Sequence, residues 1–450
     1  MKPLRRCASV ASVAPVVSVA LLMVGQTARG QGVEEALDLA TGSASVFTAL
    51  NHNRVDLGDR TESTTEPSVG LAGTLAGDFN SGPNSLLLDY SGTVETRREE
   101  SANQTTDSSW FSGASRFNHV GPGNRYDFGL GHTVRSVRND TGFVTNLSSY
   151  DTQNVINAGA GVRFFPGDLS TLRISADASK GFGEGDLGDT TSYLAKAELE
   201  RRLSNRSFAI LTGSRSWADE ENLDLIIDSA QLGYLINLDS GTFSIGAGVS
   251  EAESEFPNGA VTNSDAVIGY LNRTWIADQW TMSVSYDRSL SDSAIDQVVD
   301  VPRFGGPAEL NVRLNDLSVT DAVDLRYTSR QLCDVCNFGL LLGGEARKSE
   351  FSGQTTHELR GGLDLGFQLT SLQRLEFSYL WQGETNEDAG VILEQVHRFD
   401  TRWSRQLAEE TTFGVEFYQV YLRSRLDRAD EEEFVLRLVL THGFSMMSGR

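Results

Sequence analysis

The sequence predicts an all-β protein: a transmembrane antiparallel up-and-down β-barrel of about 18–20 strands. Three observations predict it. Many segments alternate apolar and polar residues with a period of two, as where Leu375 and Phe377 alternate with Arg374 and Glu376. Short turns and longer polar loops succeed one another along the chain, and the N-terminus resembles an export signal.

The N-terminal segment has the three parts of a secretory signal peptide. A basic start, MKPLRR, precedes the apolar run CASVASVAPVVSVALLMVG, and the small residues Ala28 and Gly30, separated by Arg29, precede a cleavage site before Gln31. An uncleaved membrane anchor is the alternative, but Pro15 and the weak apolarity of Ala and Ser favour cleavage. We therefore expect residues 1–30 to be removed and residues 31–44 to form a short N-terminal periplasmic segment.

Composition narrows the possible partners. The formal net charge of −23 argues against nucleic acid, because binding a phosphate backbone requires basic patches. After the signal, no run approaches the ~20 apolar residues that a transmembrane helix needs. One of the three cysteines, Cys7, would leave with the signal, so a disulfide-dense scaffold is excluded.

Between residues 45 and 444, which we predict to form the barrel, hairpins recur with short turns at one end and longer polar loops at the other. This asymmetry is typical of outer-membrane barrels, and nine short turns with ten long loops predict about twenty strands, with residues 445–450 as a C-terminal tail. The short turns are FNSGPN (79–84), VGPGN (120–124), FPGDLS (165–170), LSNRS (203–207), LDSG (238–241), IADQ (276–279), LCDVCN (332–337), LTSLQ (369–373) and LAEET (407–411). A soluble propeller or sandwich fits less well, because half of every strand is polar. Leu375 and Phe377 are thus expected to face lipid, and Arg374 and Glu376 the lumen.

Two segments, RRLSNRSFAILTGSRSWADEENLD and LNRTWIADQWTMSVSYDRSLSDSA, resemble the outer-membrane β-barrel porin family associated with PEP-CTERM/exosortase systems and exopolysaccharide loci. The resemblance covers roughly residues 45–444 and rests on turn and alternation patterns. It implies a channel linked to exopolysaccharide export, with polysaccharide as a partner, and supplies no functional residue. Phe444 fits the terminal signal read by the outer-membrane assembly machinery, whereas His442 departs from the usual apolar residue.

Charged residues on the predicted inner face gather in the last third of the chain. The candidate pore-lining residues are Arg326, Arg347, Glu358, Arg360, Asp364, Arg374, Glu376, Arg398, Asp400, Arg402, Glu416 and Arg437, and Glu345 and Glu394 are assigned to the same inner face. They predict either a constriction whose transverse field selects polar solutes or a solvated wall of compensating ion pairs. The acidic loops are expected to be solvated rather than metal-binding.

Two further features stand out. Cys333 and Cys336 lie in a predicted periplasmic turn, where a disulfide between them is favoured over redox or zinc chemistry, which would need a helix or further ligands. The longest connection, SAIDQVVDVPRFGGPAEL (293–310), predicts either a loop folded into the channel or a surface loop that grips lipopolysaccharide or a neighbouring subunit. Its candidate constriction residues are Val298, Val299, Val301, Pro302, Arg303 and Phe304.

No catalytic motif appears, and the six histidines are scattered, so we expect neither an enzyme nor a cofactor or metal. The sequence predicts an outer-membrane channel or conduit of a Gram-negative bacterium, in contact with lipid and lipopolysaccharide. The alternatives are a structural or adhesive surface barrel and, less favoured, an outer-membrane hydrolase.

Overall fold

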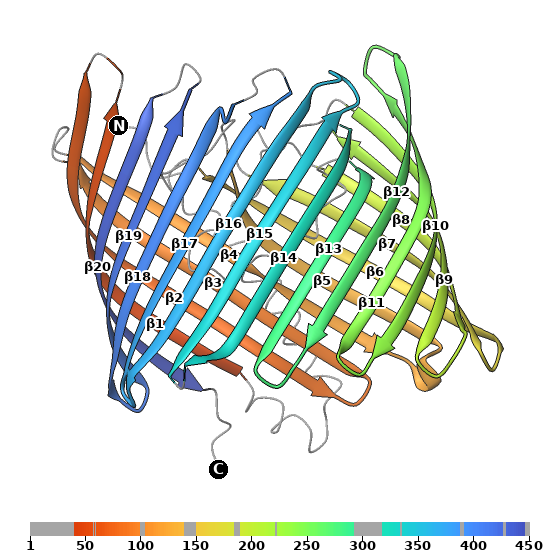
Figure 1. Ribbon diagram of the computed structural model, residues 1–450, viewed down its shortest axis with the longest axis horizontal. Helices are drawn as coiled ribbons and strands as arrows, with labels where there is room; N and C mark the ends of the chain where they lie inside the picture. Colours follow the sequence, from red (N-terminus) through yellow and green to blue (C-terminus); the bar gives the residue numbers. More distant parts are fainter. Residues whose placement is uncertain are drawn as a thin grey trace.

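The alternating segments form strands in the computed structural model, which describes residues 40–445 except 57, 59, 100–103, 139–149, 184–189, 221–222, 292–316, 334, 388–390 and 426–428 (Figure 1). The strands are β1 (Ala40–Asp56), β2 (Thr61–Ser81), β3 (Asn84–Glu99), β4 (Gln104–Val120), β5 (Tyr126–Arg138), β6 (Tyr150–Gly167), β7 (Ser170–Gly183), β8 (Thr190–Arg202), β9 (Ser207–Glu220), β10 (Leu223–Leu238), β11 (Gly241–Glu255), β12 (Val261–Ile276), β13 (Trp280–Ser291), β14 (Ser318–Cys333), β15 (Cys336–Ser349), β16 (Thr355–Thr370), β17 (Gln373–Asn386), β18 (Glu394–Ala408), β19 (Thr411–Ser424) and β20 (Asp430–Ser445). The predicted signal peptide, residues 31–39 of the predicted periplasmic segment and residues 446–450 lie outside this description, whereas residues 40–44, assigned to the same segment, begin β1.

The strands form one sheet of twenty that closes on itself. Each strand pairs antiparallel with the next, and β1 pairs with β20 from Thr41 opposite Ser445 to Asp56 opposite Asp430. The predicted fold class is therefore confirmed, and the strand count falls at the upper end of the predicted range. Closure has a physical reason, because a sheet in hydrocarbon cannot leave backbone groups unpaired at an edge.

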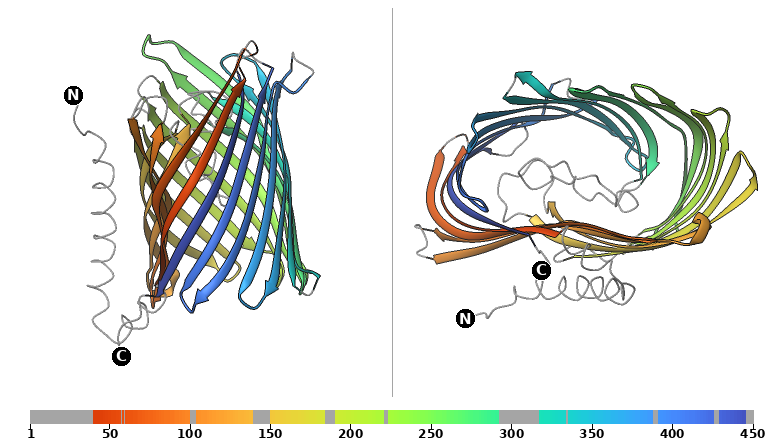
Figure 2. Two further views of the ribbon diagram at one scale, coloured as in Figure 1. Left: turned by 90° about the vertical axis from the view of Figure 1, so that its left-hand side faces the viewer. Right: turned by 90° about the horizontal axis from the view of Figure 1, so that it is seen from below.

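The turns confirm the hairpin pattern read from the sequence. Each of the nine predicted short turns joins two consecutive strands, as Ser371 and Leu372 join β16 to β17. Gly82, with a φ of 57°, occupies the turn between β2 and β3, a left-handed conformation that suits glycine. Figure 2 shows the barrel from below with an oval cross-section, in which the red to yellow strands form the flatter wall.

Large apolar side chains on one face of the strands are exposed, which identifies the outward face. Phe377, Phe399, Leu436 and Leu438 are 39%, 40%, 47% and 43% exposed. In water such a surface would be costly, whereas an outward apolar band is what a membrane barrel presents to lipid. We call the opposite face of the wall the lumen face.

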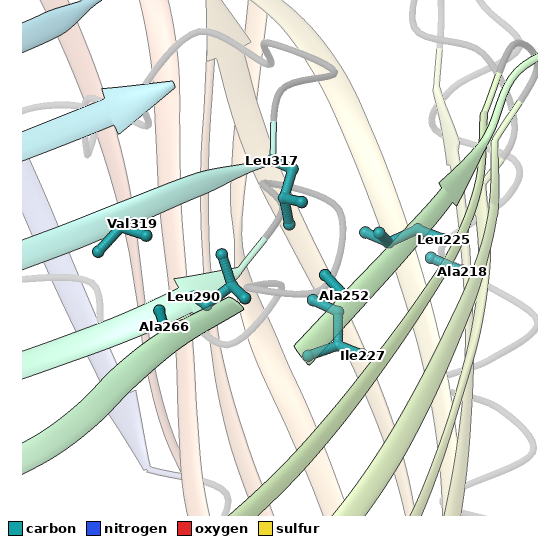
Figure 3. Packing of buried hydrophobic residues seen from close by; sticks show 8 residues of the cluster. All are labelled: Ala218, Leu225, Ile227, Ala252, Ala266, Leu290, Leu317 and Val319. Atoms are coloured by element: carbon teal, nitrogen blue, oxygen red, sulfur yellow. The ribbon is translucent and has the colours of Figure 1, made fainter. Parts of the chain in front are cut away.

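Buried apolar residues form several separate clusters rather than one core. One cluster comprises Ala218, Leu225, Ile227, Ala252, Ala266, Leu290, Leu317 and Val319, contributed by strands β9 to β14 and the residue preceding β14 (Figure 3). Another, comprising Phe47, Ala49, Val435 and Val439, joins β1 to β20 where the barrel closes. Among the described residues, no helix is long and apolar enough to cross a membrane.

Candidate functional site: the charged lumen face

The twelve residues predicted to line a pore all lie on the lumen face. Arg437 stands between the exposed residues Leu436 and Leu438, and Arg398 and Asp400 flank the exposed Phe399. Residues directly opposite in neighbouring strands share a face, so the cross-strand register extends this assignment to the others. The strands arrange these charges in rows that run across the wall.

The first row joins Glu376, Arg402, Glu416 and Arg437, which are directly opposite one another on β17 to β20. Arg402 Nε lies 3.3 Å from Glu416 Oε1, and Arg437 Nη1 lies 3.7 Å from Glu416 Oε2. The sign of the charge alternates along the row, which favours pairing between neighbouring strands. Arg437 also extends over the ring of Phe47, with its guanidinium carbon 4.4 Å from the ring centroid.

A second row holds two carboxylates separated by a small residue. Ser378 lies directly between Asp364 and Asp400. The Ser378 hydroxyl donates a long hydrogen bond of 3.4 Å to Asp400 Oδ2. The space beside Ser378 is therefore flanked by negative charge on both sides.

In a third row an ion pair spans a whole strand. Arg360 Nη2 on β16 lies 2.6 Å from Asp324 Oδ1 on β14, and Gly343 of β15 stands between them. A Cβ atom on Gly343 would lie 2.5 Å from Arg360 Nε and 2.6 Å from Asp324 Oδ1. The absence of a side chain at Gly343 is what lets the arginine cross.

A fourth row is acidic throughout. Glu345, Glu358, Glu384 and Glu394 occupy directly opposite positions on β15 to β18, close to the long-loop end. Arg347 Nη2 lies 2.7 Å from Glu345 Oε1, and the Ser424 hydroxyl donates to Glu394 Oε1. Glu384 was not among the sequence candidates, because its row position depends on the strand register and no local motif marks it.

A buried charged group lies across the closure of the barrel, and the sequence prediction missed it. Arg97 of β3 places Nε 3.3 Å from Glu95 Oε1 and Nη1 3.8 Å from Glu433 Oε1 of β20. Asn51 of β1 donates to Glu95, which is only 2% exposed. These contacts join β20, β1 and β3 on the lumen face. The alternation of Glu95 and Arg97 in VETRREE was the available signal.

The opposite wall is also charged, although the sequence candidates covered only the last third of the chain. Asp127 of β5 forms ion pairs with two arginines. Its Oδ1 lies 3.0 Å from Arg163 Nη1, and its Oδ2 lies 2.8 Å from Arg173 Nη2. Lys196 and Glu198 pair at 2.8 Å on β8. Charges of both signs therefore occur on both walls of the lumen face.

The remaining candidates are placed less completely. Cys336 is disulfide-bonded, and Cys333 stands opposite it at the β14–β15 turn. The Cys333 side chain lies outside the described residues, so the pairing of the two cysteines stays a prediction. The candidate constriction residues, Val298 to Phe304, also lie outside them. Within the part of the chain that the structure describes, no three His, Cys, Asp or Glu side chains form a group that could hold a metal.

No protein-family model matches this chain, and no curated protein matches its sequence. Solved structures with a similar arrangement of strands include the FrpB iron transporter from Neisseria meningitidis (F3-3 variant), at 9% identity and a TM-score of 0.49, covering 92% of this chain and 83% of that one. Pseudomonas aeruginosa OccK5 (OpdH) is 13% identical with a TM-score of 0.34, covering 91% of this chain and 99% of that one. P. aeruginosa OccK2 (OpdF) in complex with glucuronate is 11% identical with a TM-score of 0.38, covering 89% and 98%. At these sequence identities and TM-scores, the barrel fold rests on this chain's own strand pairing.

Proposed function

We propose that this protein is an outer-membrane channel of a Gram-negative bacterium that conducts small polar and charged solutes and catalyses no reaction. The observation that carries the proposal is the division of the wall into an exposed apolar outward face and a lumen face crossed by rows of charged residues. The apolar outward face is stable against lipid, and the charged lumen face is stable against water.

Water inside the barrel follows from the energetics of the lumen face. Moving an ionised side chain out of water is expensive unless it is fully paired. The side chains of Arg402 and Arg374 are each 48% exposed, so both charged groups remain in contact with solvent. A barrel of about twenty strands is also wider than its own side chains fill.

The acidic row gives the proposed channel a preference for cations. Glu345, Glu358, Glu384 and Glu394 lie near the long-loop end, where a solute from outside would enter. Rows of carboxylates concentrate cations and repel anions at a channel mouth. The deeper rows, with both signs, then favour polar and zwitterionic solutes.

A narrower form of the proposal is that the conducted molecule is an exported polysaccharide, as the sequence resemblance implies. The resemblance alone supports this form. The alternating charges and hydroxyl groups of the lumen rows are compatible with a hydroxyl-rich chain. We also propose that the 293–310 loop, which contains Val298 to Phe304, narrows the channel, since its valines would be costly in open water.

Single-channel recording in planar bilayers tests the proposal. Purified refolded protein should give discrete conductance steps with a reversal potential that indicates cation preference. A folded barrel without conductance would refute the channel and favour the structural or adhesive alternative. Adding a soluble acidic or neutral oligosaccharide tests the narrower form, because an exported chain should transiently block the current.

A further inference from the structure

The wall has a recess where the ladder between β12 and β13 ends early. β13 is a strand of 12 residues, and its pairing with β12 stops at Gly269 opposite Arg288. β12 continues beyond that point to Val261, and among the described residues this part has no strand partner on the β13 side. A cavity of about 360 Å³ lies there, between β12, β14 and β15.

The height of the recess follows from the charges on its outward face. Arg288 and Asp321 lie on that face, and charged side chains there are costly at the bilayer midplane, so the recess belongs at the level of the lipid headgroups. The side chain of Arg288 satisfies one orphan group, donating from Nε to the Val267 carbonyl at 3.0 Å. Val267 itself is 66% exposed, which places the mouth of the recess on the outward face.

Charges of both signs line the recess. Arg288 Nη1 donates to both carboxylate oxygens of Asp321, at 3.1 and 2.8 Å, and Tyr286 donates to the same Asp321 at 2.7 Å. Lys348, Asp265 and Glu350 line the same cavity and make no ion pair with another described residue. Two cationic and three anionic side chains thus surround one space.

We propose that this recess binds the phosphoethanolamine group of a membrane lipid. Lys348 and the remaining N–H groups of Arg288 donate hydrogen bonds to the phosphate. Asp265 and Glu350 accept hydrogen bonds from the ammonium. A lipid with a phosphate but no ammonium group would bind less well, because the carboxylates of Asp265 and Glu350 would then face an anion. The site requires a barrel in a lipid bilayer but does not require that the barrel conducts.

Native mass spectrometry of the detergent-solubilised full chain tests the site with phosphatidylethanolamine, phosphatidylglycerol and lipopolysaccharide with or without phosphoethanolamine. The protein should retain phosphoethanolamine-bearing lipid over its counterpart that lacks the group. The double variant Lys348→Gln, Asp265→Asn removes one charge-assisted hydrogen bond to the phosphate and one to the ammonium. It should reduce that retention about a hundredfold, because each such bond is worth about tenfold.

The matched control is Arg54→Gln, Asp224→Asn, which removes one charge of each sign from exposed outward positions away from the recess. It should retain lipid as the parent does. Selective retention of either lipid source supports the site and identifies that source. Equal retention of lipid with and without the phosphoethanolamine group in both sources overturns the proposal. So does equal retention by both double variants when both migrate as folded barrels in unheated gels.

Discussion

Two adjacent positions on β17 test the division of the wall into a lipid face and a lumen face. Phe377 is 39% exposed on the outward face, where its ring contacts Phe367 edge-on at 6.4 Å between centroids. Ser378 points to the lumen face between Asp364 and Asp400. Arginine introduced at each position places the same cationic side chain in lipid at 377 and in the lumen at 378.

The expected costs differ in size and origin. Phe377→Arg places a cation in hydrocarbon and should cost about 2–4 kcal/mol, or roughly 30- to 700-fold in the folding equilibrium. Ser378→Arg loses one long hydrogen bond and gains two carboxylates directly opposite, each worth about 0.2–1 kcal/mol. The second variant should therefore be within about 1 kcal/mol of the parent, on either side.

Equilibrium urea titration during refolding into lipid vesicles measures both values, with tryptophan fluorescence as the signal. Protection from protease establishes that each variant inserts. Leu375→Arg, also on the outward face of β17, serves as a second lipid-facing variant. Equal costs at positions 377 and 378 would mean that the assignment of faces is wrong, and a greater cost at 378 would mean that it is reversed.

Four further predictions concern the lumen, the turn and the long loop. In a salt gradient, Glu358→Gln combined with Glu384→Gln should move the reversal potential toward that of an unselective channel, because half of the acidic row loses its charge. An unchanged reversal potential would show that this row does not contribute to ion selectivity. Gly343→Val should separate Arg360 from Asp324 and destabilise the barrel in urea, whereas Gly213→Val, at a position with open space around the glycine, should be milder; equal effects would show that the crossing does not depend on Gly343. Cys333 and Cys336 should react with a maleimide only after reduction, and replacing both with serine should leave the barrel assembled, since so short a loop restricts few unfolded conformations; labelling without reductant contradicts the disulfide. Deleting residues 298–307 should raise single-channel conductance if the long loop narrows the pore, and unchanged conductance in an assembled barrel would place that loop outside it.

The sequence by itself determined the features of this protein that have a local physical cause. An alternation of two residues fixes which side chains share a face, so Phe377 and Ser378 could be assigned to opposite sides without a structure. The breaks between alternating segments located all nine short connections, and seven of them contain glycine, asparagine or aspartate, which adopt turn conformations at low cost. Strand number followed directly from these turns.

Only the tertiary structure decided which charges meet. Arg97 and Glu433 lie at opposite ends of the chain and come together because β20 pairs with β1, which local sequence does not encode. The pairing of Arg360 with Asp324 depends on a glycine in the strand between them, and the recess at Arg288 depends on where the β12–β13 ladder stops. Register and closure are properties of the whole sheet, because each strand's position is set by the strands on both sides of it and by the requirement that the last strand meets the first.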